Sequence, residues 1–339
     1  RGAQAIHGEV HPVVAMAYST LGLSCDLAGR YEAARENLEK SLDLSERMFG
    51  PDHTEVADDL HNLTTALNSL GRHQEALRAS RRSVEIREKV LGRDHIDVAT
   101  SLTNLAMTLE DLGRDDEALR AYSRSLAITV KAHGTDHVDV AEHLMPVAHM
   151  HLKRRDYATA WKLYERARVI EEKRGGAWIG EAYDGLARVR RAQKRYRDAT
   201  RLLRRGIATH STAPGSQLHH GKRMRILGEV YLDWRRPDRA RVELERALAF
   251  WADAAGHKPV EAVIEERAEA RFALARALWH RRGTRSRALA VARTARDELA
   301  GAGQPRAAQR ADVESWLASR AQPAGVKRRG KPRMKRRHR

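Results

Sequence analysis

The chain has 339 residues, of which 42% are hydrophobic and 32% are charged, and Cys25 is its single cysteine. One cysteine excludes an internal disulfide and fits a reducing compartment. No stretch approaches the eighteen consecutive apolar residues of a membrane-spanning helix, and no signal peptide opens the chain. We therefore expect a cytoplasmic protein without a membrane span.

The charge is unevenly distributed. Residues 1–134 carry 16 Lys and Arg against 21 Asp and Glu, whereas residues 135–339 carry 47 against 24. The front of the chain is therefore mildly acidic and the back strongly basic, which favours a partner whose own charge is divided.

The first feature in chain order is a motif that recurs every 42 residues: a glycine, a histidine three positions later and a valine after that. Its copies are Gly8/His11, Gly50/His53, Gly92/His95 and Gly134/His137. The motif fits metal ligands, binding loops or helix boundaries. Because copies lie one whole repeat apart, they cannot share a zinc ion, whose ligands lie about 2 Å away. We predict that the motif marks helix boundaries and that no metal site is present.

Each repeat reads as two helices joined by a short turn. In the second repeat the pattern predicts helices over 54–70 and 73–91, with the turn at Gly71-Arg72. Gly92 is predicted to close the second helix in the left-handed conformation. Three aspartates are predicted as N-caps, each followed three residues later by an acid in the manner of a capping box: Asp52 with Glu55, Asp94 with Asp97, and Asp136 with Asp139.

Small residues recur at two places in every repeat. The second helices carry small pairs seven apart, namely Ala34/Ser41, Ala76/Ser83, Ala118/Ser125, Ala160/Ala167, Ala199/Gly206, Ala240/Ala247 and Ala288/Ala295. The first helices carry an aliphatic residue followed by a small one, as in Leu63-Thr64 and Leu105-Ala106. This pattern resembles the tetratricopeptide repeat (TPR), in the 42-residue variety of kinesin light chains.

The resemblance implies an all-α, right-handed superhelical solenoid of about seven helix pairs over residues 8–300. Units one to four are regular and five to seven degenerate, since the second-helix alanines are 42 residues apart up to Ala160 and then 39, 41 and 48. The turn glycines Gly29, Gly71 and Gly113 become Arg155, Lys194 and Arg235 in the later units. A capping helix is expected within 301–320, at Ala307 to Arg320, because a solenoid must cover its last apolar face. Residues 1–7 read as the end of a preceding, truncated repeat, so we expect further chain upstream.

Residues 265–320 also resemble the last repeat and cap of myxobacterial serine/threonine protein kinases, in which a kinase domain precedes a TPR array. The matching residues include Phe272, Trp279 and Trp316. The resemblance implies that the parent protein is such a kinase. This fragment contains no kinase catalytic motif, so no cofactor is expected in it, and ATP and Mg²⁺ would act only with an upstream kinase domain.

In TPR arrays the first helices line a concave groove that binds peptides or partner helices. The predicted groove residues are Asn62, Asn104, Asn68, Thr65, Asp26, Glu110, Asp111, His149, Lys153, Arg188, Arg191 and Arg225. Asn62 and Asn104 match the asparagines of the kinesin light chain type, and an amide can both donate to and accept from a peptide backbone. The alternative is a polar helix face in contact with solvent.

Other candidates are interpreted as structural. His143, His149 and His151 do not share one helix face, which argues against a metal site. Cys25 occupies a helix-packing position and is predicted to be buried. The tryptophans, all in the basic half, are expected to fill gaps between repeats.

The chain ends in a basic segment. Residues 321–339 are predicted to be a disordered tail, whose cations are Lys327, Arg328, Arg329, Lys331, Arg333, Lys335, Arg336, Arg337 and Arg339. The tail could bind nucleic acid or an acidic partner through counterion release, or it could be inert.

The favoured function is a scaffold that binds protein partners, as the regulatory part of a kinase. The alternative is a stand-alone adaptor that associates with nucleic acid or acidic partners through its tail. An enzyme in its own right is disfavoured, because no nucleophile, base and orienting group stand at suitable spacing. The sequence does not predict the oligomeric state.

Overall fold

The computed structural model describes residues 10–174, 176, 178–209, 216–253, 261–300 and 307–321, which form helices and no strand. The α-helices are α2 (Pro12–Leu27), α3 (Tyr31–Phe49), α4 (Thr54–Ser69), α5 (His73–Leu91), α6 (Ile96–Asp111), α7 (Asp115–His133), α8 (Val138–Lys153), α9 (Tyr157–Arg174), α10 (Ile179–Ala192), α11 (Tyr196–Ala208), α12 (Ser216–Asp233), α13 (Pro237–Asp253), α14 (Glu261–Trp279), α15 (Arg285–Ala300) and α16 (Ala307–Ala321). The predicted bounds of the second repeat agree with α4 and α5 to within one residue.

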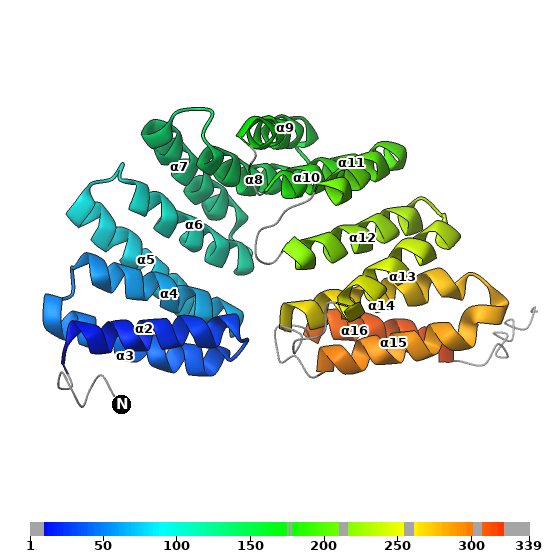
Figure 1. Cartoon of the computed structure of the whole chain (residues 1–339), viewed down its shortest axis with the longest axis horizontal. Coiled ribbons are helices and arrows are strands. Elements are labelled where there is room, and N and C mark those ends of the chain that lie inside the picture. The colour runs from blue at the N-terminus through cyan, green and yellow to red at the C-terminus, as the bar shows by residue number, and fades with distance from the viewer. Residues whose placement is uncertain are drawn as a thin grey trace, which may run out of the picture.

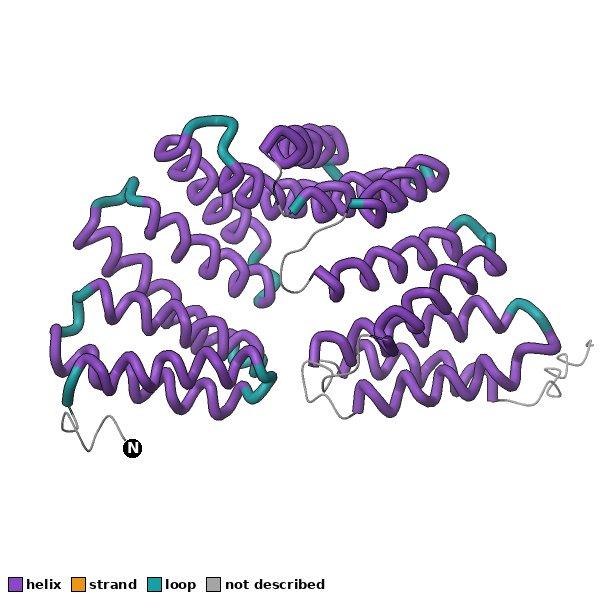
Figure 2. The backbone as a smooth tube through the Cα atoms, in the orientation of Figure 1, coloured by secondary structure: helices purple, strands orange, loops and turns teal. Residues whose placement is uncertain are grey.

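Consecutive helices pack as seven antiparallel pairs, from α2/α3 to α14/α15, and the pairs stack in chain order. The stack follows an arch, with the first pairs at one end, the last pairs at the other and α8 to α11 at the crown (Figure 1). Where the connecting residues are described, short loops join the helices (Figure 2). First helices of neighbouring units also contact one another: α2 with α4, α4 with α6, α8 with α10, and α12 with α14. The first helices therefore line the inner side of the arch.

Small side chains allow the close approach within each pair. Every alanine and serine of the predicted small pairs is at most 1% exposed, and Gly206 is buried too. A Cβ at Gly22 would lie 2.6 Å from Leu38 Cγ, and a Cβ at Gly228 would lie 2.5 Å from Leu244 Cγ. Both contacts are shorter than atoms tolerate, so glycine is required for the leucine of the second helix to pack there.

The turn within each pair keeps one conformation after its glycine is lost. Gly29, Gly71 and Gly113 have φ of 73°, 73° and 71°, and at the same place Arg155, Lys194 and Arg235 have φ of 61°, 59° and 57°. The residue after each turn donates to a carbonyl five residues back, as Arg72 does to Leu67 and Arg195 to Arg190. The degenerate units are therefore irregular in sequence but not in turn geometry.

The glycines between units adopt a different conformation from the one predicted. Gly92 has φ 89° and ψ 156°, and Gly50 and Gly134 are alike. A positive φ with an extended ψ is not the left-handed helical cap; it belongs to a region that essentially only glycine occupies. The glycines close their helices as predicted, each donating its N–H to the carbonyl four residues back, but the left-handed cap geometry was wrong, because ψ is extended.

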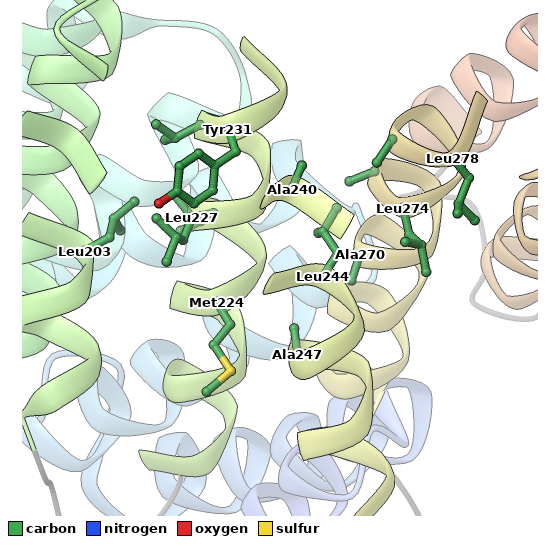
Figure 3. Packing of buried hydrophobic residues seen from close by; sticks show 14 of the residues in the cluster. Leu203, Met224, Leu227, Tyr231, Ala240, Leu244, Ala247, Ala270, Leu274 and Leu278 are labelled. Carbon is green, nitrogen blue, oxygen red and sulfur yellow. The ribbon is translucent and has the colours of Figure 1, made fainter. Parts of the chain in front are cut away.

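The hydrophobic core of the second half of the chain includes several large side chains beside the small ones. Leu203, Leu227, Tyr231, Leu244 and Leu274 come from α11 to α14 and fill the space between successive pairs (Figure 3). At the end of the array α16 buries Val313, and its Trp316 ring meets the rings of Phe272 at 5.9 Å and Trp279 at 5.6 Å. The predicted solenoid with a C-terminal capping helix is confirmed.

Two further expectations concern Cys25 and the membrane. Cys25 is 3% exposed, so its predicted burial is confirmed. Among the described residues, no helix combines the length and the apolar character that crossing a bilayer requires.

Candidate functional site

The predicted groove residues all lie on first helices. Asp26 lies on α2, Asn62, Thr65 and Asn68 on α4, Asn104, Glu110 and Asp111 on α6, His149 and Lys153 on α8, Arg188 and Arg191 on α10, and Arg225 on α12. The inner side of the arch thus carries the polar surface from which a binding site could be built. The contacts of these side chains determine which of them are free to bind a partner.

Two of the three asparagines connect neighbouring layers. Asn104 Nδ2 lies 3.3 Å from the carbonyl oxygen of His61 and 3.0 Å from its Nδ1, one repeat earlier. Asn68 donates to Thr108 Oγ1 at 2.9 Å, one repeat later. Asn62 is half-buried and makes no hydrogen bond to the described part of the chain. Asn62 is therefore the amide most available to a peptide backbone.

Charged groove residues are also paired between layers. Glu110 lies 3.3 Å from His149 Nε2 and 3.2 Å from Lys153 Nζ, which also contacts Asp115 at 2.7 Å. The hydrogen bond from His149 outweighs burial and lowers the pKa of Glu110. The third and fourth helix pairs are thus joined by an ion-pair network that spans α6, α7 and α8.

The groove arginines are mostly neutralised by carboxylates of the next layer. Arg191 contacts Glu229 at 2.9 Å and Asp233 at 2.7 Å. Arg225 is 8% exposed and contacts Glu229, Glu266 at 2.6 Å and Glu269 at 3.0 Å. Of the three predicted groove arginines, only Arg188 has no ion pair among the described residues. The basic residues of the back half therefore do not form a continuous stripe of unpaired positive charge along the groove.

A hollow of about 370 Å³ opens at the middle of the groove. Its walls come from the first helices α6, α8, α10 and α12, and Tyr122 and Tyr164 of the second helices α7 and α9 also line it. Glu110, His149 and Arg188, which were predicted, line it together with Asp184 and Glu142, which were not. Burial raises the pKa of Asp184 to about 7 despite the neighbouring Arg223.

A signal for this hollow was present in the sequence. Pro146 and Gly185 occupy the position that Asn62 and Asn104 occupy in earlier repeats, directly before the aliphatic residue of the first helix. Proline and glycine have no side-chain amide, so the asparagines at this position are replaced in two of the repeats that line the hollow.

The recurring histidines cap the first helices. His53 Nδ1 and His95 Nδ1 each accept a hydrogen bond from the backbone N–H two residues later, at 3.2 Å, and His11 and His137 do the same. The prediction of Asp52, Asp94 and Asp136 as N-caps is wrong by one residue, since the helices begin after the histidines. Asp52 and Asp94 instead pair with Lys89 of α5 and Lys131 of α7, the second helix of the pair that each aspartate precedes.

One group of side chains in the described ranges has the composition of a metal site: His133, His137 and Asp139. The two imidazole rings stack with centroids 4.7 Å apart and planes within 20° of each other. Nitrogen lone pairs lie in the ring plane, so nearly parallel rings cannot direct them at one ion. Phe49 stacks on His53 in the same way. The geometry therefore fits capping and packing.

The other histidines of α8 have separate partners. His143 Nδ1 lies 2.9 Å from the carbonyl oxygen of Asp139, His151 Nδ1 lies 3.1 Å from Asp156, and His149 contacts Glu110.

A second hollow, of about 510 Å³, lies on the opposite side of the arch between α11 and α13. Its described lining includes five arginines and no carboxylate, namely Arg197, Arg201, Arg204, Arg205 and Arg239, beside the stacked rings of Tyr231 and Trp234. We call it the outer arginine groove.

The predicted basic tail, 321–339, lies outside the residues whose side chains are described.

Comparison with known proteins identifies the repeats. The tetratricopeptide repeat family model matches residues 1–47, 13–89, 60–131 and 97–168. No curated protein matches the chain.

Similar solved structures include the TPR-like repeats of a Podosopora anserina kinesin light chain, with a TM-score of 0.51, 21% identity, and coverage of 62% of this chain and 100% of that one. BtubC (BKLC) from P. vanneervenii has a TM-score of 0.53 and 17% identity, covering 72% and 94%. The apo form of RapI has a TM-score of 0.62 and 15% identity, covering 85% and 99%. At such identities the likeness concerns the fold.

Proposed function

Because this chain belongs to the tetratricopeptide repeat family, we propose that it is a protein-interaction scaffold whose inner groove binds an extended segment or a helix of a partner protein. The observation that carries the proposal is the hollow at mid-groove, which six helices line with polar side chains and two tyrosines. Arg188, which lines the hollow, and Asn62, which lies on the first helix α4, have no hydrogen bond or ion pair among the described residues.

A structure of similar fold supports a ligand-binding role. A Rap protein complexed with Competence and Sporulation Factor has a TM-score of 0.57 and 15% identity, covering 89% of this chain and 75% of that one. By analogy, an arch of this kind is suited to hold a second molecule. Many polar side chains of this groove already bind side chains of the neighbouring repeat. We therefore expect the partner to contact the polar groups that have no such bond.

A photo-crosslinking experiment tests the groove. A crosslinking amino acid replaces Asn62 on the inner side, and the control replaces Arg120, an exposed residue of the second helix α7. Crosslinking of one specific protein from Asn62 and not from Arg120 is expected. Equal yields at the two positions, or crosslinks only from Arg120, would contradict the proposal.

We also propose that the array belongs to a serine/threonine protein kinase and acts in the cytoplasm as its regulatory or substrate-recruiting part. The support is the resemblance of residues 265–320 to the end of myxobacterial kinases. Sequencing the gene upstream of Arg1 tests it. An in-frame kinase domain is expected, and an upstream reading frame of another kind would reject it.

A second candidate function is association with nucleic acid through the basic back half. The observation that favours it is the outer arginine groove, whose described lining contains five arginines and no carboxylate, a composition suited to phosphates. Binding of a single-stranded oligonucleotide should weaken steeply with salt. Arg201→Ala/Arg205→Ala and deletion of residues 326–339 separate the groove from the tail, and salt-independent or absent binding would exclude both.

A further inference from the structure

The position directly before the aliphatic–small pair of each first helix changes from a polar residue to proline or glycine along the groove. Asn62 and Asn104 hold it in the second and third repeats, and Pro146 and Gly185 hold it in the next two. Proline has no N–H, so the carbonyl of Glu142, four residues before Pro146, lacks its usual helical donor. The helix α8 therefore presents an extra acceptor where the side-chain amide is missing.

Gly185 makes room for an aromatic ring. A Cβ at this position would lie 2.1 Å from Tyr164 Cε1, so any larger residue would displace the ring. Tyr164 comes from the second helix α9 and, with Tyr122 of α7, forms the back of the 370 Å³ hollow, which we call the mid-groove pocket. Burial raises the pKa of Tyr164 to about 12, so both its ring and its neutral hydroxyl belong to the wall at neutral pH.

The wall of the pocket contains a buried acceptor without a partner. Asp184 is 8% exposed, and its Oδ2 accepts from Arg223 Nε at 3.1 Å. Its Oδ1 has no hydrogen-bond partner in the described structure. A buried acceptor in this state is unfavourable unless a ligand supplies the missing donor.

The charges of the wall favour a cation. Glu142 is exposed and has no ion pair among the described residues, so it adds a carboxylate without a partner cation beside the unpaired oxygen of Asp184. Three basic side chains of the wall are directed at other carboxylates: His149 at Glu110, His219 at Glu181 at 3.0 Å, and Lys222 at Glu266 at 3.3 Å. Arg188 alone is unpaired, and it is half-buried one helical turn from Asp184.

We propose that the mid-groove pocket binds an arginine side chain of the partner protein, with Asp184 Oδ1 accepting from the guanidinium and Tyr122 and Tyr164 beside its plane. A planar guanidinium supplies several donors to carboxylates and stacks on aromatic rings, which matches this wall better than a lysine ammonium. The inference rests on the proposed function, because it specifies the part of the partner that the groove recognises.

The test uses the pocket without any unidentified partner. The ¹³C-methyl NMR signal of Met145, which lines the pocket, is followed while N-acetyl-arginine methylamide is added. Met145→Leu assigns the signal. A saturable shift is expected, with a dissociation constant on the order of 1 mM for so small a ligand. The citrulline analogue, which has the same shape without the charge, should bind about tenfold more weakly.

Variants distinguish a cation site from an anion site. Asp184→Asn should weaken arginine binding about tenfold, and Glu142→Gln, at an exposed position where folding is not at risk, should weaken it severalfold. Arg188→Ala should leave it unchanged or strengthen it. Binding of N-acetyl-glutamate methylamide that is lost in Arg188→Ala would overturn the proposal, as would a Met145 signal that does not saturate with arginine. A specific crosslink from Asn62 in that case would leave the scaffold function standing.

Discussion

The hydroxyl oxygen of Ser125 lies 2.8 Å from the main-chain carbonyl oxygen of Ala99, on the other helix of the same pair. Ser83 makes the same bond to Ala57 at 2.9 Å, and Ser41 makes it to Ala15 at 3.0 Å. The second small residue of the first three repeats therefore combines close packing with a hydrogen bond between the helices. Ala167 and Gly206 take this position in the later repeats and cannot make the bond.

Ser125→Ala is expected to lower the free energy of unfolding by about 1 kcal/mol, the net value of one buried hydrogen bond. The carbonyl of Ala99 keeps Thr103 as a donor, at 3.0 Å, so no acceptor is left empty. Urea unfolding of the two proteins measures the difference. Ala167→Ser is the reciprocal change and should be neutral or stabilising. A loss in that variant similar to the loss in Ser125→Ala would show that the hydroxyl has no such role.

Ala118→Leu should destabilise the third helix pair by about 1 to 3 kcal/mol, because Ala118 is 0% exposed and the added atoms must displace α6 from α7. The control is Arg120→Leu, on the exposed face of α7, which should change stability by less than about 0.5 kcal/mol. Circular dichroism during urea unfolding gives both values. Equal stability of the two variants would mean that the contact between the helices does not depend on a small residue at position 118.

Lys194→Gly should stabilise the fifth pair. Lys194 has φ 59°, a left-handed conformation that costs an L-residue about 1 to 2 kcal/mol, whereas the unfolded-state entropy of glycine costs about 0.5 to 1 kcal/mol. A net gain of about 0.5 kcal/mol is expected in thermal unfolding. Lys194→Ala keeps the strain and should leave stability nearly unchanged, so a gain in the alanine variant would implicate the lysine charge instead.

Asp184→Asn should alter the pH dependence of stability. The pKa of Asp184 is raised to about 7 in the folded protein, mainly by burial, and returns to about 4 on unfolding. The folded state therefore holds more protons between these values, and the stability of the wild-type protein falls as pH rises from about 4 to 7.

Asparagine does not titrate, so the stability of Asp184→Asn relative to the wild-type protein should rise over that window by up to about 4 kcal/mol. Thermal unfolding at a series of pH values measures the change. A constant difference between the two proteins from pH 4 to 7 would show that Asp184 is ionised throughout.

The sequence by itself determined the helix pairs, their order and their packing, because these features depend on local periodicity and on small residues at fixed spacing. The resemblance of the second repeat to its neighbours was enough to place α4 and α5. The N-caps were misplaced by one residue because an aspartate and a histidine stand side by side, and both side chains are able to cap a helix.

Only the tertiary structure decided which groove residues are free. The helical periodicity predicts that Arg225 and Asn104 both face the groove, yet each of them contacts a residue about one repeat away. Such pairing depends on the stacking of one layer on the next, which brings side chains about forty residues apart within 3 Å. The mid-groove pocket has the same origin, since its lining residues come from four successive pairs, the third to the sixth, and converge only when these pairs stack.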